Sequence, residues 1–171
     1  MEDADEPLDA MSVDDGGEAE SGRGLALAYR FLNRRERSVS EVRERLERAE
    51  IPGDEIESVI SELLEYGYLD DTRYARVFAE DKRTLDQWGA DRIARTLRER
   101  GIDRDLIEAT LAASGDGEDE SELDRALGFL QQRFPAGPAD RRDRERAFGM
   151  LARKGYESEV AGDAIRVWAR G

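Results

Sequence analysis

Apolar residues recur every three or four positions along most of the chain, which is the spacing that lines one face of an α-helix. Tyr74, Phe78 and Leu85, for example, fall on one such face. Nine segments of this kind follow one another between Leu25 and Trp168, and alternating β-branched runs are few. The pattern predicts an all-α protein of nine helices with no sheet.

The nine segments fall into three related sets. Leu46–Ile51, Leu97–Ile102 and Leu151–Tyr156 each mark the junction between the second and third helix of a set. Glycine precedes the last residue of this mark in the second and third sets, whereas the first set has Glu50 there. Recurrence at a fixed period is typical of repeat proteins, so the sequence predicts three tandem three-helix repeats stacked end to end into an elongated, curved array.

Local signals predict several helix ends. Ser38, with Glu41 three residues later, has the pattern of a capping box. Asp70 and Asp71 stand where an N-cap is needed, because a carboxylate accepts from free first-turn amides and meets the positive end of the helix dipole. Gly101 stands where a helix would end in a left-handed turn. Helical spacing also assigns to the core a set of residues that includes Leu64, Leu85 and Ala109.

Charge is distributed unevenly along the chain. Residues 1–20 contain nine acids and no base, and residues 115–120 contain four acids and no base. Outside these two stretches, 28 acidic and 27 basic residues remain. We expect the first stretch to be disordered, because it has too little apolar surface to offset the entropy of ordering. The expected organisation is a disordered acidic tail at 1–23, repeats at 24–69, 70–114 and 121–171, and an acidic linker at 115–120.

Composition excludes several kinds of chemistry. The chain has no cysteine and no histidine, which removes disulfides, thiolate chemistry and the commonest general base. No phosphate-binding glycine loop, membrane-spanning run or secretory signal is evident, and no nucleophile accompanies the acid pair Asp70 and Asp71. We therefore expect a cytoplasmic monomer that is not an enzyme and binds no cofactor, metal ion or membrane.

Arginine supplies nearly all the positive charge, since Lys82 and Lys154 are the only lysines. The guanidinium fork suits carboxylates and phosphates, although surface arginines often only pair locally. Arginines recur outside the apolar faces of the two helices in 70–100 and again in the first repeat. The candidate binding residues are Arg73, Arg76, Arg83, Arg92, Arg95, Arg98, Arg30, Arg34, Arg35 and Arg37.

A resemblance gives these arginines a context. Residues 67–75 read GYLDDTRYA, and Gly89, Arg92-Ile93, Leu97-Arg98 and Gly101-Ile102 follow. In this order and spacing the stretch resembles the central repeat of the RecX family, regulators of the bacterial recombinase RecA. The resemblance continues more weakly from Leu25 to Trp168.

The resemblance implies a function in DNA repair, recombination and the SOS response. Members form a curved array of repeats that lies in the helical groove of the RecA–DNA filament and inhibits ATP hydrolysis, strand exchange and filament growth. It implies that this chain binds the RecA filament, and DNA weakly and without sequence specificity, whether single- or double-stranded. Asp70, Asp71, Arg73, Tyr74 and Ala75 match the family motif, and Arg73 is its expected external contact.

Two other functions fit a chain of three-helix units. A helix-turn-helix DNA-binding protein would need a basic recognition helix, and Arg92–Arg100 is the best candidate, although Asp91 and Glu99 dilute its charge. A helical adaptor for another protein is the second alternative. The acidic tail and the 115–120 linker lie outside the motif that carries the resemblance.

Overall fold

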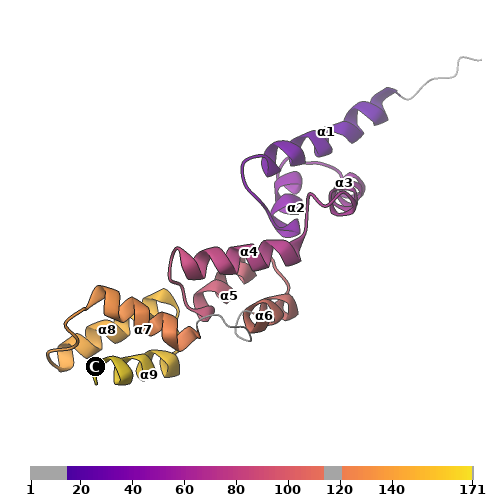
Figure 1. Ribbon diagram of the computed structural model, residues 1–171. Coiled ribbons are helices and arrows are strands. Elements are labelled where there is room, and N and C mark those ends of the chain that lie inside the picture. Colours follow the sequence, from indigo (N-terminus) through magenta and orange to yellow (C-terminus); the bar gives the residue numbers. More distant parts are fainter. Residues whose placement is uncertain (1–14, 114–120, 171) are drawn as a thin grey trace, which may run out of the picture.

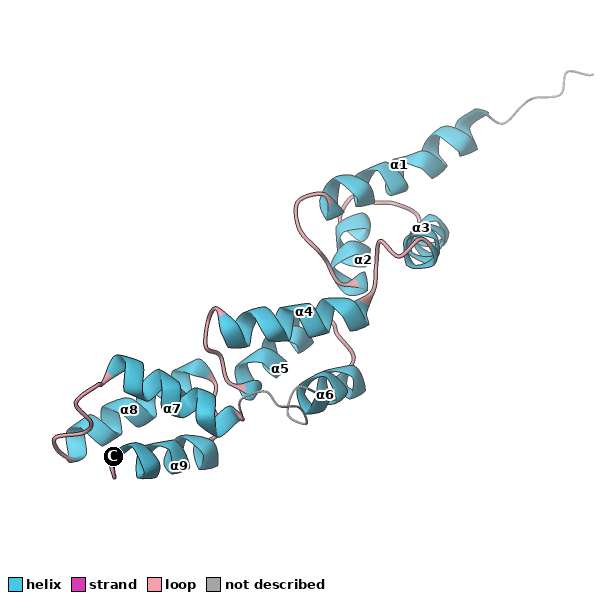
Figure 2. Cartoon of the chain, viewed as in Figure 1, coloured by secondary structure: helices cyan, strands magenta, loops and turns pink. Residues whose placement is uncertain are grey.

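The computed structural model describes residues 15–113 and 121–170 of the chain. The described residues form nine α-helices and no strand, which confirms the predicted all-α class (Figure 2). The helices are α1 (Asp15–Leu32), α2 (Val39–Glu47), α3 (Gly53–Glu65), α4 (Asp71–Thr84), α5 (Ala90–Glu99), α6 (Arg104–Ala113), α7 (Glu122–Arg133), α8 (Arg141–Lys154) and α9 (Ser158–Trp168).

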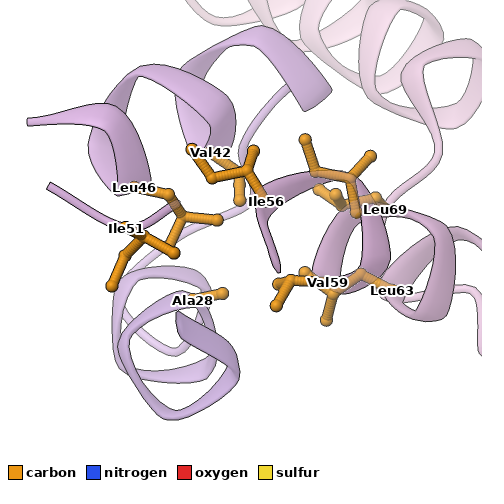
Figure 3. Packing of buried hydrophobic residues seen from close by; sticks show 9 residues of the cluster. Ala28, Val42, Leu46, Ile51, Ile56, Val59, Leu63 and Leu69 are labelled. Carbon is orange, nitrogen blue, oxygen red and sulfur yellow. The ribbon is translucent and has the colours of Figure 1, made fainter. Parts of the chain in front are cut away.

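The helices lie in three groups strung along an elongated molecule, here called repeat 1 (α1–α3), repeat 2 (α4–α6) and repeat 3 (α7–α9) (Figure 1). Each repeat has its own cluster of buried apolar residues. In repeat 1, Ala28, Leu46 and Leu63 converge from its three helices (Figure 3). Each repeat thus buries its own stripes, and the repeats meet through short contacts between helix ends.

The first helix begins earlier than the sequence pattern suggests. We expected it to start at Leu25, but α1 begins at Asp15, inside the stretch to residue 23 that we expected to be disordered. Helix formation is costly to nucleate but gains a hydrogen bond with each added residue, so the packed part of α1 can extend it backwards. The remaining tail residues 1–14 and the 115–120 linker lie outside the described residues.

Some of the residues that we assigned to the core are on the surface. Leu85 is the C-cap of α4 and is 78% exposed, because it lies beyond the part of α4 that packs on the other helices of repeat 2. Leu64 is 46% exposed at the edge of the α3 stripe. In α6 the buried residues are Ile107 and Thr110, while Ala109 is exposed.

The helix caps were predicted correctly with one exception. Ser38 forms the expected capping box with Glu41, and Gly101 has the expected left-handed conformation with φ of 74°. Asp70 caps α4, where its Oδ1 accepts from the backbone N–H of Arg73 at 2.9 Å. Asp71 does not cap its own helix, because its carboxylate points to Val39 in the preceding repeat.

Candidate regulatory surface

Repeats 1 and 2 are joined where the start of α2 meets the end of α5. The hydroxyl of Ser38 donates to the carbonyl oxygen of Arg100 at 2.6 Å. The backbone N–H of Val39 donates to Oδ1 of Asp71 at 2.9 Å. The positive end of one helix dipole therefore meets the negative end of another, and a carboxylate from repeat 2 satisfies a first-turn amide of α2.

Repeats 2 and 3 are joined in the same way. The backbone N–H groups of Gly89 and Asp91 donate to the carbonyl oxygens of Lys154 (2.9 Å) and Gly155 (3.1 Å), at the end of α8. Oε1 of Glu122, the first residue of α7, accepts from the backbone N–H of Ala90 at 2.7 Å. Glu122 thus has the same role as Asp71 one repeat earlier, so the two joints share one construction.

Close approach at the joints explains the recurrent glycines. A Cβ on Gly155 would lie 2.3 Å from Cβ of Arg92, and one on Gly101 would lie 2.3 Å from Cβ of Ser40. Glu50 takes the corresponding place in repeat 1 with φ of 57°, and no described repeat docks against it. The sequence pattern alone pointed to a helix stop at these glycines, whereas the structure shows that the neighbouring repeat also requires them.

Arg92 belongs to the second joint and not to a free arginine face. Its guanidinium lies 3.9 Å from the ring centroid of Trp88, and it donates to the carbonyl oxygen of Arg153 at 3.2 Å. Nearby, Nζ of Lys154 donates to the backbone oxygen of Asp86 at 2.6 Å. The pKa of the Asp86 carboxyl is lowered, mainly by its hydrogen bond from Lys82. These contacts hold the turn between α4 and α5 against repeat 3.

Three other candidate arginines also make local contacts. Arg35 and Arg37 both pair with the carboxylate of Glu41, at 2.7 and 3.3 Å, and Arg37 also stacks 4.1 Å from the Phe31 ring centroid. Arg73 lies 3.5 Å from Oε1 of Glu36 and donates to the carbonyl oxygen of Gly67 at 3.2 Å. Arg73 therefore lies beside repeat 1, and its guanidinium already contacts residues of that repeat.

Arg83 is half-buried and has a weaker local contact. It donates to the carbonyl oxygen of Leu111 at 3.4 Å. Burial lowers the pKa of its guanidinium, and repulsion from Arg125 adds to the effect. Arg83 therefore faces another cation at the boundary between repeats 2 and 3.

The remaining five candidates are exposed, and their side chains make no ion pair or hydrogen bond with any residue that the structure describes. They are Arg30, Arg34, Arg76, Arg95 and Arg98. We call these five the exposed arginines. They extend over repeats 1 and 2, and their guanidinium groups are available to external carboxylates or phosphates.

The described part of the chain offers little for other chemistry. Within 15–113 and 121–170, no cluster of three or more carboxylates is arranged to hold a metal ion. None of the described helices is both long and apolar enough to cross a membrane.

Comparison with known proteins identifies the fold and the family. Residues 25–63 match the model of the first three-helix domain of RecX, and residues 70–111 match that of the second. The crystal structure of RecX from Lactobacillus salivarius superposes with a TM-score of 0.76 at 20% identity, covering 90% of this chain and 99% of that one. This likeness shows the fold.

Proteins named regulatory protein RecX also match in sequence. The one from Deinococcus radiodurans is 39% identical over 83% of this chain and 66% of its own length. The one from Chromobacterium violaceum is 32% identical over 83% of this chain and 89% of its own length. The chain spans no more than about two thirds of several curated relatives, with shares of 66%, 59% and 36%. On the family models and these relatives together, the chain belongs to the RecX family of regulatory proteins.

Proposed function

We propose that this protein is a negative regulator of RecA that binds in the helical groove of the RecA–DNA filament. There it inhibits ATP hydrolysis, strand exchange and filament growth. It acts as a cytoplasmic monomer and contacts DNA weakly and without sequence preference. Family membership supports this proposal, and the arrangement of the described residues agrees with it.

The observation that carries the proposal is the repeated joint. Asp71 and Glu122 each cap a helix of the preceding repeat, so both joints share the same carboxylate-to-amide hydrogen bond. Repeats that are stacked through similar joints form an extended body, and such a body suits a partner whose surface also repeats. Such a body can contact several subunits of a filament at once.

The exposed arginines supply the contacts. They lie on repeats 1 and 2 and have no internal carboxylate among the described residues, so binding a partner does not require breaking an existing ion pair. Contacts shared among several weak sites raise the overall affinity through high effective concentration. This arrangement favours a filament, which repeats its surface, over a single subunit.

The helix-turn-helix alternative has less support. DNA-reading proteins of that class place the first residues of the recognition helix in the major groove. The start of α5 is covered instead by the end of α8, and Glu122 accepts from the backbone N–H of Ala90. At the other end of α5, Arg100 lies 4.6 Å from the Phe78 ring centroid and donates to the hydroxyl of Tyr74. Both ends of this helix are therefore engaged within the protein.

A direct assay tests the proposal. RecA, single-stranded DNA and ATP are mixed with increasing amounts of this protein, and the rate of ATP hydrolysis is followed. We expect inhibition at amounts below one protein per RecA subunit, because each bound array spans several subunits. Unchanged hydrolysis at equimolar protein, together with a sequence-selective footprint on duplex DNA, would favour the DNA-reading alternative.

A further inference from the structure

A groove of about 880 Å³ runs along the boundary between repeats 2 and 3, lined by α4, α6 and α7. Its floor is apolar, with Leu106 and Ala109 from α6 and Phe129 from α7. At one end, Nε2 of Gln87 donates to Oε1 of Gln132 at 3.2 Å, which links the two repeats across the groove. The groove is therefore a partly apolar surface with no described helix packed into it.

Positive charge lines this apolar floor. Arg76 and Arg83 reach the groove from α4, and Arg125 reaches it from α7. Among the described residues that line the groove, Glu80 is the only carboxylate, and Glu122 acts on Arg83 from outside the lining. Burying the guanidinium of Arg83 is costly, and an anionic ligand that pairs with Arg83 and with the exposed Arg76 relieves that cost.

The lining favours a peptide over a nucleic-acid strand. Proteins that bind single-stranded nucleic acid stack the bases on exposed aromatic rings. Phe129 is the single aromatic residue in the described part of the lining, and it is only 7% exposed. An amphipathic helix, in contrast, lays apolar side chains on an apolar floor and presents its flanking charges to the rims.

We propose that this groove binds an acidic amphipathic helical segment of a partner protein. Its apolar side chains pack on Leu106, Ala109 and Phe129, and its carboxylates pair with Arg76 and Arg83. The proposal deepens the proposed function and rests on it in part, because Arg76 and Arg83 belong to both surfaces. A carboxylate of the peptide would neutralise the charge of the half-buried Arg83. The carbonyl oxygen of Leu111, which accepts its hydrogen bond in the free protein, is neutral and cannot do so.

A fluorescein-labelled peptide tests this proposal. The probe is a synthetic helix of about 15 residues, or ~22 Å, with leucines at positions i, i+3, i+4 and i+7 and glutamates on both flanks. Fluorescence anisotropy is followed as the full-length protein is added. We expect saturable binding, weakened about tenfold by Arg76→Glu, because the change replaces an attractive charge with a repulsive one.

Two further variants separate the groove from general charge attraction. Ala109→Glu places a charge on the floor without altering an arginine and should weaken binding by a similar factor. Arg95→Glu makes the same charge change as Arg76→Glu, but on α5 outside the lining, and should leave binding nearly unchanged. Equal loss with Arg95→Glu, or no loss with the two groove variants, would overturn the proposal.

Two more measurements distinguish a failure of the groove proposal from a failure of the proposed function. The first is binding of a labelled oligothymidylate. If it displaces the peptide from the wild-type protein and binds the groove variants more weakly, the groove binds nucleic acid and the proposal is overturned. RecA ATP hydrolysis is measured with the same variants. A wild-type protein that inhibits RecA but does not bind the peptide would contradict the groove proposal alone. A protein that binds the peptide in the groove but does not inhibit RecA would contradict the proposed function alone.

Discussion

Asp71 and Val39 are linked by a hydrogen bond of 2.9 Å that crosses from repeat 2 to repeat 1. The carboxylate lies in the first turn of α4 but caps α2, so a residue of one repeat completes a helix of the repeat before it. Glu122 and Ala90 repeat this relationship at the second joint. Hydrogen bonds between carboxylates and backbone amides therefore help to hold the array in line.

Replacing Asp71 tests this link. Asp71→Ala removes the acceptor and leaves the N–H of Val39 unsatisfied, which should lower the free energy of unfolding by about 1–3 kcal/mol. Asp71→Asn keeps an acceptor oxygen and should stay within about 1 kcal/mol of the wild type at neutral pH. Chemical denaturation of the three proteins measures the difference. Equal stability of the Ala variant and the wild type would show that the bond contributes nothing.

The same variants have a predictable pH dependence. Burial raises the pKa of the Asp71 carboxyl above its ordinary value, against the opposing effect of the hydrogen bond from Val39. The folded protein therefore holds this proton more tightly than the unfolded chain, and ionisation of Asp71 as pH rises costs folding free energy. The stability of Asp71→Asn relative to the wild type should be greatest at neutral pH and should decrease as pH falls through the range in which the carboxyl titrates. Melts at several pH values check this sign, and an opposite trend would contradict it.

Gly155 offers a test of the close approach at the second joint. It has φ of 88°, and an added Cβ would lie 2.6 Å from the backbone nitrogen of Arg92. Gly155→Ala combines left-handed strain with overpacking and should cost about 2–5 kcal/mol. Gly67→Ala is the matched control, because Gly67 has φ of 72° but nothing within 4 Å of an added Cβ. It should cost only about 1–2 kcal/mol. Equal losses in melting temperature for the two variants would mean that the joint accommodates the added Cβ with no further loss of stability.

Phe78 and Leu85 lie on the same predicted stripe but differ in burial. Phe78 is 9% exposed and packs within repeat 2, whereas Leu85 is 78% exposed. Phe78→Ala should cost about 3–5 kcal/mol by opening a cavity, and Leu85→Ala should change stability by less than about 0.5 kcal/mol. Thermal melts of both variants give the comparison. A similar loss for both would place Leu85 in the core after all.

Periodicity in the sequence predicted the helices and the capping box at Ser38, because both depend on neighbours within a few residues. It could not predict that Asp71 accepts a hydrogen bond from Val39, since the two residues are far apart in sequence and only the stacking of repeats brings them together. The same limit applies to the arginine faces. Arg92 and Arg83 look like exposed residues on a helical wheel, yet one stacks on Trp88 at a joint and the other is half-buried against repeat 3.

If the exposed arginines bind the RecA filament, reversing the charge of Arg95 and Arg98 should abolish much of the inhibition. Both are exposed on α5, outside the groove lining, and make no ion pair with a described residue. Arg95→Glu with Arg98→Glu should barely change the melting temperature, because exposed charges contribute about 0–1 kcal/mol to stability. Interface charge contacts can contribute ~2–5 kcal/mol, so we expect inhibition to require at least about tenfold more protein.

The decisive measurement compares this variant with a control in the RecA ATP hydrolysis assay with single-stranded DNA. The control is Arg142→Glu with Arg144→Glu, which makes the same charge change on exposed residues of α8 in repeat 3. We expect the Arg95/Arg98 variant to lose inhibition while the control stays close to the wild type. A folded Arg95/Arg98 variant that inhibits at wild-type concentrations, or a control that loses as much, would contradict this expectation.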